Sequence, residues 1–136
     1  MKEETPERLR QHPESRFAAM QHSFNLDEVA ARLKQELEAG EAGHRQETLY
    51  KRGPMSVSLF LFGHLTRLAP HRAKGVVTIQ VLKGHLQVKA EGQVHDLPAG
   101  HLLLLASGVE HDVAAQLESQ MLLTVCLDDQ ETEPSP

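Results

Sequence analysis

The sequence contains no tryptophan, one tyrosine and four phenylalanines, so aromatic residues are only 4% of its 136 residues. Proteins that bind single-stranded nucleic acid commonly stack its bases on exposed aromatic rings, and this chain has little material for such a platform. Basic residues are also in the minority, with 14 lysines and arginines against 19 acidic residues and a net charge of −5. Because no dense basic block is present to neutralise phosphates, we expect no nucleic-acid partner.

Cysteine and long apolar runs are scarce as well. The single cysteine, Cys126, cannot form an internal disulfide. The first residues, MKEETPERLR, lack the apolar stretch of a secretory signal. The longest apolar runs, such as HLLLLASGV, are much shorter than the roughly 20 residues that a membrane-spanning helix needs. We therefore expect a single-domain cytoplasmic protein without a membrane partner.

Segment 23–46 is predicted to hold one helix and a linker. Its apolar residues recur at helical spacing and form one stripe, which consists of Leu26, Val29, Ala30, Leu33 and Leu37. Asn25 is placed to cap the start, with Glu28 three residues later as in a capping box, and Gly40 is placed to end the helix. The pattern predicts an amphipathic helix over residues 25–39.

The two ends of the chain have no sustained period. Residues 1–22 mix charge, proline and scattered apolar residues, which predicts a flexible N-terminal arm with at most a short helical turn near residues 17–20. Residues 128–136 are acidic and proline-bearing, which predicts a disordered tail.

From residue 47 the apolar period changes to two, which is typical of strands. In MSVSLFLF, residues 55, 57, 59 and 61 are expected on one face and residues 56, 58, 60 and 62 on the other. Similar runs follow, separated by the turn sequences KG, EG, PAG and SG. About eight short strands between residues 47 and 127 predict an all-β domain, an antiparallel sandwich or barrel, preceded by one helix.

This β region, with its VLKG turn and its LPAGHLLLLASGVEH segment, resembles a small single-domain cupin, an antiparallel jelly-roll β-barrel. In that family the motifs G-x5-H-x-H-x3/4-E-x6-G and G-x5-P-x-G-x2-H-x3-N supply three histidines and a glutamate that bind a divalent metal inside the barrel. The segment HRAKGVVTIQVLKG also resembles the corresponding segment in a group of small bacterial cupins of unassigned function, which keep a histidine before A-x-G without the usual glutamate.

Only one of three ligands survives in the first motif. If Gly84 is its closing glycine, Val77 stands at the glutamate position, Ala73 at the second histidine and His71 at the first.

The second motif keeps its glycines and its histidine. Gly100 and Gly108 match, and His111 stands at the ligand position, while Ala106 replaces the proline and Ala115 the asparagine. The resemblance therefore implies a metal-poor site with His71 and His111 as its remaining ligands.

Alternation along strands supports the same placement. Odd-numbered residues from 71 to 81 are expected on one largely apolar face, as are those from 111 to 115. We predict that His71 and His111 face each other across the barrel. The predicted ligand pocket comprises His71, Ala73, Val77, Ile79, His111 and Val113.

Two imidazoles alone hold a divalent ion weakly, because zinc and iron sites generally use three or more protein ligands. The chain has nine histidines, so a third ligand has several candidates. These are His64, His85, His95, His101 and Glu110. Each stands next to a turn or in a polar stretch, where a surface side chain is the simpler interpretation.

Three functions remain open at this stage. The leading hypothesis is a binding module whose lumen holds a small ligand, an anion being one candidate, beside His71 and His111. The alternative is a divalent-metal-dependent dioxygenase or isomerase in which these histidines and one further ligand hold Fe, Mn, Ni or Zn. A sensor or regulatory role rests on fold analogy alone. The sequence names no ligand and does not decide whether there is catalysis.

The apolar stripe of the predicted helix is too hydrophobic to stand free in water. We expect it to pack on the outer surface of the barrel or against a partner subunit. Small cupins commonly pair through their outer sheets, so the resemblance implies a homodimer.

Overall fold

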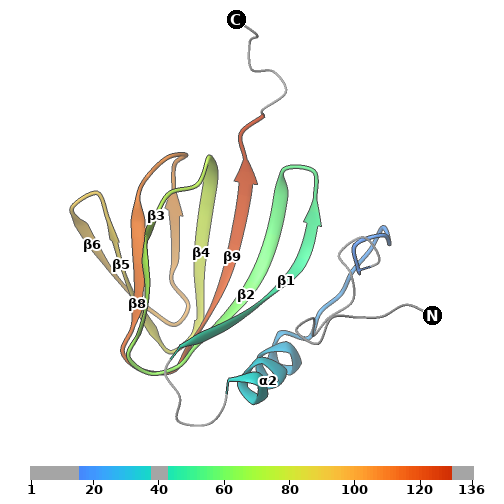
Figure 1. The fold of residues 1–136 in the computed structure, drawn as a ribbon, viewed down its shortest axis with the longest axis horizontal. Helices are drawn as coiled ribbons and strands as arrows, with labels where there is room; N and C mark the ends of the chain where they lie inside the picture. Colours follow the sequence, from blue (N-terminus) through green and yellow to red (C-terminus); the bar gives the residue numbers. More distant parts are fainter. Residues whose placement is uncertain (1–15, 38–42, 130–136) are drawn as a thin grey trace, which may run out of the picture.

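The computed structural model describes residues 16–37 and 43–129, which form two antiparallel sheets that face each other, with one helix on the outside (Figure 1). The five-stranded sheet has the order β1-β2-β9-β4-β7 and the four-stranded sheet the order β3-β8-β5-β6. The elements are α2 (Leu26–Glu36), β1 (His44–Arg52), β2 (Met55–Phe62), β3 (Thr66–His71), β4 (Gly75–Lys83), β5 (His85–Ala90), β6 (Gln93–Pro98), β7 (Leu102–Leu105), β8 (His111–Ala115) and β9 (Ser119–Leu127). The predicted jelly-roll architecture is confirmed.

The predicted faces of β2 are also confirmed, and they explain why the chain has two apolar layers. Phe60 and Phe62 point between the sheets, where they join the main core. Leu59 and Leu61 point outward, where they are buried against α2. Since successive side chains of a strand point to opposite faces, one apolar strand can serve both layers.

The main core fills the space between the sheets. It is built from fully buried aliphatic side chains of both sheets, with Ile79, Val81, Leu86 and Val88 at 0% exposure. The barrel interior around these residues is therefore occupied by tightly packed apolar side chains.

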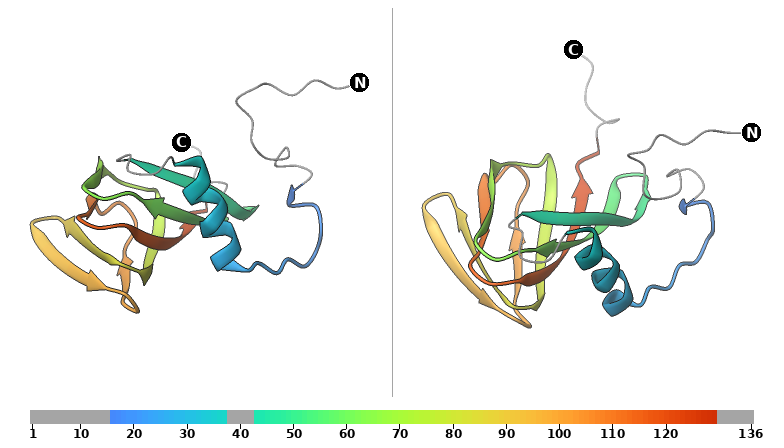
Figure 2. Two further views of the ribbon diagram at one scale, coloured as in Figure 1. Left: turned by 90° about the horizontal axis from the view of Figure 1, so that it is seen from below. Right: turned by 60° about the horizontal axis from the view of Figure 1, so that its bottom comes forward.

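Helix α2 lies on the outer face of the five-stranded sheet, over β1 and β2 (Figure 2). The predicted cap is confirmed, because Oδ1 of Asn25 accepts bonds from the backbone N–H of Asp27 at 3.0 Å and of Glu28 at 3.2 Å. The helix ends at Glu36, since Leu37 is extended with φ −95° and ψ 94°. The predicted end at residue 39 is therefore too late, and Gly40 lies outside the described residues. Within the described part of the chain, no helix is long and apolar enough to cross a membrane.

Strand β3 was not among the predicted strands. It contains Pro70, which has no backbone N–H to give to a sheet, and its residues show little alternation of burial. The strand forms because it lies at the edge of the four-stranded sheet, where it needs a partner on only one side.

The described parts of both termini contact the barrel. Arg16 donates a bond from Nη2 to the carbonyl oxygen of Thr48 at 2.6 Å. Arg16 is helical and Phe17 lies in a turn, whereas residues 19 and 20 form bends, so the short helical turn predicted near residues 17–20 reaches only its first residue. At the other end, the backbone N–H of Asp128 donates to the carbonyl oxygen of Lys74 at 2.8 Å. Residues 1–15 and 130–136, on which the rest of the predicted arm and tail fall, lie outside the described residues.

Candidate functional site

The two histidines predicted to form the site do meet. His71 is the last residue of β3 and His111 the first of β8, and the two residues are register partners in the antiparallel pair. Their ring centroids are 4.5 Å apart and the rings are inclined by 54°. We call these two residues the histidine pair.

The prediction that the two rings face each other across the barrel is wrong. β3 and β8 are neighbours in the four-stranded sheet, so His71 and His111 stand side by side on one wall. Alternation along a strand decides which face a side chain occupies, but it does not decide which strands are neighbours.

A β-bulge in β3 turns His71 to the inner face. Leu68 pairs with Val113, and the next paired residue is His71 with His111, so β3 has one more residue than β8 over this interval. Leu68 packs against the main core. Residues 68 and 71 are an odd number of positions apart, so a regular strand would point their side chains to opposite faces. The extra residue places both on the inner face. Bulges commonly re-aim a side chain near functional sites in this way.

Hydrogen bonds fix both imidazole rings in the same orientation. Nδ1 of His71 bonds the carbonyl oxygen of Ala69 and Nδ1 of His111 that of Val109, each at 3.1 Å. A carbonyl oxygen can only accept, so Nδ1 carries the proton in both rings and Nε2 of a neutral ring presents a lone pair.

The two rings differ in burial. His71 is exposed, whereas His111 is only 3% exposed. Burial lowers the pKa of His111, and the neighbouring charge of His71 lowers it further, against opposing effects of the Val109 carbonyl and of Asp112. His111 is therefore held in its neutral form near pH 7.

The other predicted pocket residues lie on the inner face but differ in exposure. Val77, Ile79 and Val113 are buried in the main core at 3%, 0% and 1% exposure. Ala73 is partly buried at the edge of that core. Room for a ligand is therefore to be sought at the end of the barrel that carries the histidine pair.

A charged recess of about 240 Å³ adjoins His111 at this end. Its lining residues are Pro70, Lys89, Glu91, Gly92, Glu110, His111 and Asp112. Asp112 is buried there and accepts bonds from Nη2 of Arg67 at 2.6 Å and from the backbone N–H of Lys89 at 3.2 Å. Burial raises the pKa of Asp112, but the bonds from Arg67 and Lys89 and their charges lower it below its usual value.

Apart from Glu110, the charged residues that line this recess were not predicted from the sequence. Asp112 alternates with the inward-facing His111 and Val113, so its outward position was available from the strand pattern. Its partner Arg67 was not, because β3 was not recognised as a strand.

The candidates for a third metal ligand do not complete a metal site with the histidine pair, although Glu110 lines the same recess as His111. Glu110 forms an ion pair with Arg72 at 3.0 Å, and His85 bonds Asp96 at 2.7 Å. His85 opens β5, whereas His111 pairs with Ala90 at the other end of that strand.

The remaining three candidates lie elsewhere. His64 is exposed beside a turn in which Leu65 bonds Gln116, at the far end of β8 from His111. His101 is exposed next to Val81, and His95, which lies on β6, pairs with Val88 of β5. Within residues 16–37 and 43–129, no group of three histidine, cysteine, aspartate or glutamate side chains could hold a metal ion. The histidine pair does not fit a three-ligand metal centre.

Comparison with known proteins supports the fold and relates part of the chain to a family of domains. Residues 60–123 match the family model of the AraC-like ligand binding domain. A search of curated proteins found no match to the sequence.

Solved structures agree with this assignment. A conserved protein of unknown function from Streptococcus pyogenes is similar over 81% of this chain and 92% of its own, with 21% identity and a TM-score of 0.66. A cupin superfamily protein from Desulfitobacterium hafniense is similar over 69% and 86%, with 21% identity and a TM-score of 0.64. An RmlC-like cupin from Desulfovibrio desulfuricans is similar over 79% and 97%, with 22% identity and a TM-score of 0.63. The described part of the chain therefore has the cupin fold, and residues 60–123 are similar to an AraC-like ligand binding domain.

Proposed function

We propose that the protein binds a small polar ligand at the end of the barrel that carries the histidine pair. The observation that supports this most is Nε2 of His111. The ring is buried, its Nδ1 is bonded to Val109, and no protein group in the described residues bonds Nε2. Buried polar atoms nearly always have a partner, so this nitrogen requires one from outside the protein.

The chemistry of the pair selects a ligand that donates hydrogen bonds. A neutral imidazole with a protonated Nδ1 offers only a lone pair at Nε2, which accepts from a hydroxyl or N–H group. An anion would need a proton on Nε2, and the lowered pKa of His111 opposes that near neutrality. We therefore refine the expectation of an anionic ligand: neutral hydroxylated molecules bind near pH 7, and anions bind only in acid.

The experiment is an NMR titration of the histidine ring signals with a panel of neutral polyols and with inorganic phosphate. We expect a polyol to shift the His71 and His111 signals at pH 7.5, and phosphate to do so only well below pH 6.5. His71→Ala should weaken polyol binding, whereas His101→Ala, which changes an exposed histidine elsewhere, should not. If no compound shifts either ring at any pH, the proposal fails.

The metal-dependent alternative is tested on the same protein without an affinity tag. A dioxygenase or isomerase that used Fe, Mn, Ni or Zn would need a third ligand beside the histidine pair. Elemental analysis should give well below one ion per chain, and added Zn²⁺ should not protect His71 and His111 together from modification. One tightly held ion per chain would favour the enzyme.

We also propose a homodimer that pairs through the free end of the five-stranded sheet. β7 is an edge strand whose Leu102 and Leu104 are 57% and 62% exposed, and Val76 on the adjoining β4 is 45% exposed. Such an edge is self-complementary about a twofold axis and would otherwise invite uncontrolled pairing. Light scattering should give twice the chain mass, and Cys126, beside Val76, should react slowly with maleimide. Leu104→Lys should release monomers with a fast-reacting Cys126.

A further inference from the structure

We propose that the protein has a second binding site, on the outer face of the five-stranded sheet, that takes a small planar aromatic anion. The site is a pocket of about 350 Å³ between β1–β2 and residues 16–24, which we call the strap. Its lining residues are Met20, His22, Phe24, Leu49, Tyr50 and Val57. The volume is within the range of small-molecule pockets, and the lining is mostly apolar and aromatic.

A β-bulge in β1 makes the floor of this pocket. Thr48 pairs with Ser58 and Tyr50 with Val57, so Leu49 is an extra residue in the strand. Thr48 faces the other way, towards Ser58, with the two hydroxyl oxygens 3.4 Å apart. The bulge thereby lets Leu49 and Tyr50 both line the outer face beside Val57. A regular strand would send two consecutive side chains to opposite faces.

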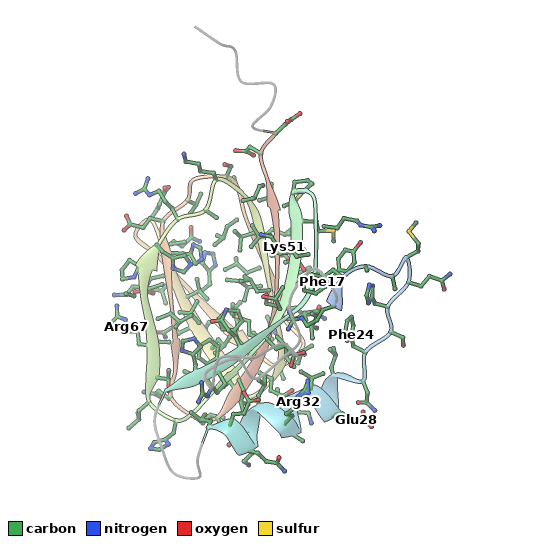
Figure 3. The ribbon with its side chains drawn as sticks, turned by 45° about the vertical axis from the view of Figure 1, so that its right-hand side comes forward. Phe17, Phe24, Glu28, Arg32, Lys51 and Arg67 are labelled. Atoms are coloured by element: carbon green, nitrogen blue, oxygen red, sulfur yellow. The ribbon has the colours of Figure 1, made fainter. Side chains whose placement is uncertain are left out.

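The strap makes the walls, and aromatic rings hold it against β1. Figure 3 shows the strap running alongside β1, with Phe17 and Phe24 on it. The ring of Tyr50 meets that of Phe17 edge-on at 6.1 Å and that of His22 at 5.3 Å, and His22 stacks on Phe24 at 6.1 Å with 2° between the planes. A flat ring inserted here would have aromatic faces and edges on two sides.

Arg52 supplies the positive charge. It lies two residues after Tyr50, and its Nη1 approaches Sδ of Met20, a lining residue, at 3.7 Å. Thioether sulfur is a weak acceptor, so the guanidinium keeps most of its hydrogen-bonding capacity. Arg32, Arg67 and Arg72 each pair with an acid. In the described part of the chain Arg52 has no acidic partner.

These features select one class of ligand. The rings and aliphatic floor favour a flat apolar body, and the guanidinium at the rim favours a carboxylate or similar planar anion, which it can bind with two parallel bonds. The histidine pair lies on the inner face of the other sheet, so this site is independent of the one proposed above.

Tyr50 makes the site directly observable, because the chain has one tyrosine and no tryptophan. Its fluorescence therefore reports on this pocket alone. We would titrate the full chain with naphthoate and with the neutral naphthamide. Naphthoate should quench Tyr50 emission to a saturable limit, and naphthamide should bind about tenfold more weakly, since it lacks the charge-assisted bonds.

Two variants and their controls separate the contributions. Arg52→Gln should weaken naphthoate about tenfold and leave naphthamide unchanged, so that the two ligands become equal. Lys51→Gln, the adjacent residue on the opposite face of β1, should change neither. Phe24→Ala should weaken both ligands. His71→Ala should leave naphthoate binding intact, which distinguishes this site from the histidine pair.

Three results would overturn the proposal. The first is no saturable quenching by naphthoate, confirmed by calorimetry. The second is equal binding of naphthoate to the wild type and to Arg52→Gln with Phe24→Ala also unchanged, which would mean non-specific adsorption. The third is Tyr50 emission that changes with protein concentration alone, which would mean that a second copy of the chain occupies the pocket.

Discussion

The two proposed sites are both made by a β-bulge, but the scaffold that holds them differs. In β3 the extra residue turns His71 inward beside His111, on strands that also carry the main core. In β1 it places Leu49 and Tyr50 on the outer face, and the opposite wall is a strap held by ring contacts and a few side-chain bonds. The same irregularity thus gives a polar site between two paired strands of one sheet, and an aromatic site between the other sheet and a separate segment.

The difference should appear first in stability. Ile79 is fully buried between the sheets, so Ile79→Ala should lower the free energy of unfolding by about 2–5 kcal/mol. In this variant the NMR signals of the histidine pair should broaden while the fluorescence of Tyr50 still responds to naphthoate. Urea unfolding followed by circular dichroism measures the first effect and NMR the second. A loss below about 1 kcal/mol would show that the interior is not packed as described.

Substitution of Asp112 tests how much its bonds to Arg67 and Lys89 stabilise the strands beside the histidine pair. Asp112→Ala removes the partner of Arg67 and of the Lys89 N–H, and should cost about 1–3 kcal/mol. The folded pKa of Asp112 is lowered, so its stabilisation is present above the ordinary aspartate pKa of 3.8 and is lost as pH falls through the still lower folded pKa. The wild type and the variant should therefore converge in stability only in strong acid. Convergence near neutral pH would contradict the assignment.

Loss of an aromatic side chain from the strap should hardly change the free energy of unfolding. Phe24 is 40% exposed, so Phe24→Ala should lower the free energy of unfolding by less than about 1 kcal/mol while it weakens naphthoate binding. Thermal unfolding and Tyr50 fluorescence measure the two effects on the same sample. A loss as large as that of Ile79→Ala would make the strap part of the core and remove the contrast between the sites.

The smallest expected effect is a pKa shift within the histidine pair. His71 is one cause of the lowered pKa of His111, and burial is the larger one. His71→Ala should therefore raise the pKa of His111 slightly and leave it below 6.5. Because folding favours the neutral ring, the stability that His111 contributes is present above pH 6.5 and is lost as pH falls through its folded pKa. NMR titration of the His111 ring tests this, and an unchanged value would mean that the two rings do not interact.

Local patterns were enough for the parts of the fold that depend on near neighbours. The stripe from Leu26 to Leu37 predicted α2 and its buried face, and Asn25 predicted the cap. The alternation in β2 predicted that Leu59 and Phe60 would face different layers. Strand β3 was not predicted, because Pro70 and the bulge interrupt the alternation of apolar and polar residues.

The site shows where such patterns stop. The motif resemblance selected His71 and His111, and alternation placed His111 on the inner face with Val113. Neither could tell that β3 and β8 are adjacent, so the rings were expected across the barrel. The strap pocket had no local signal, because Phe24 and Tyr50 are brought together by packing between segments far apart along the chain.

The two periodicities, the charge balance and the residues able to do chemistry follow from the order of side chains along the chain, so they could be established without coordinates. Chain folding was needed to bring two imidazoles side by side with one ring buried, and to place an arginine without an acidic partner in the described residues beside a ring-lined pocket. Strand pairing and bulges set those relations, and both arise from hydrogen bonds between segments that are distant in sequence.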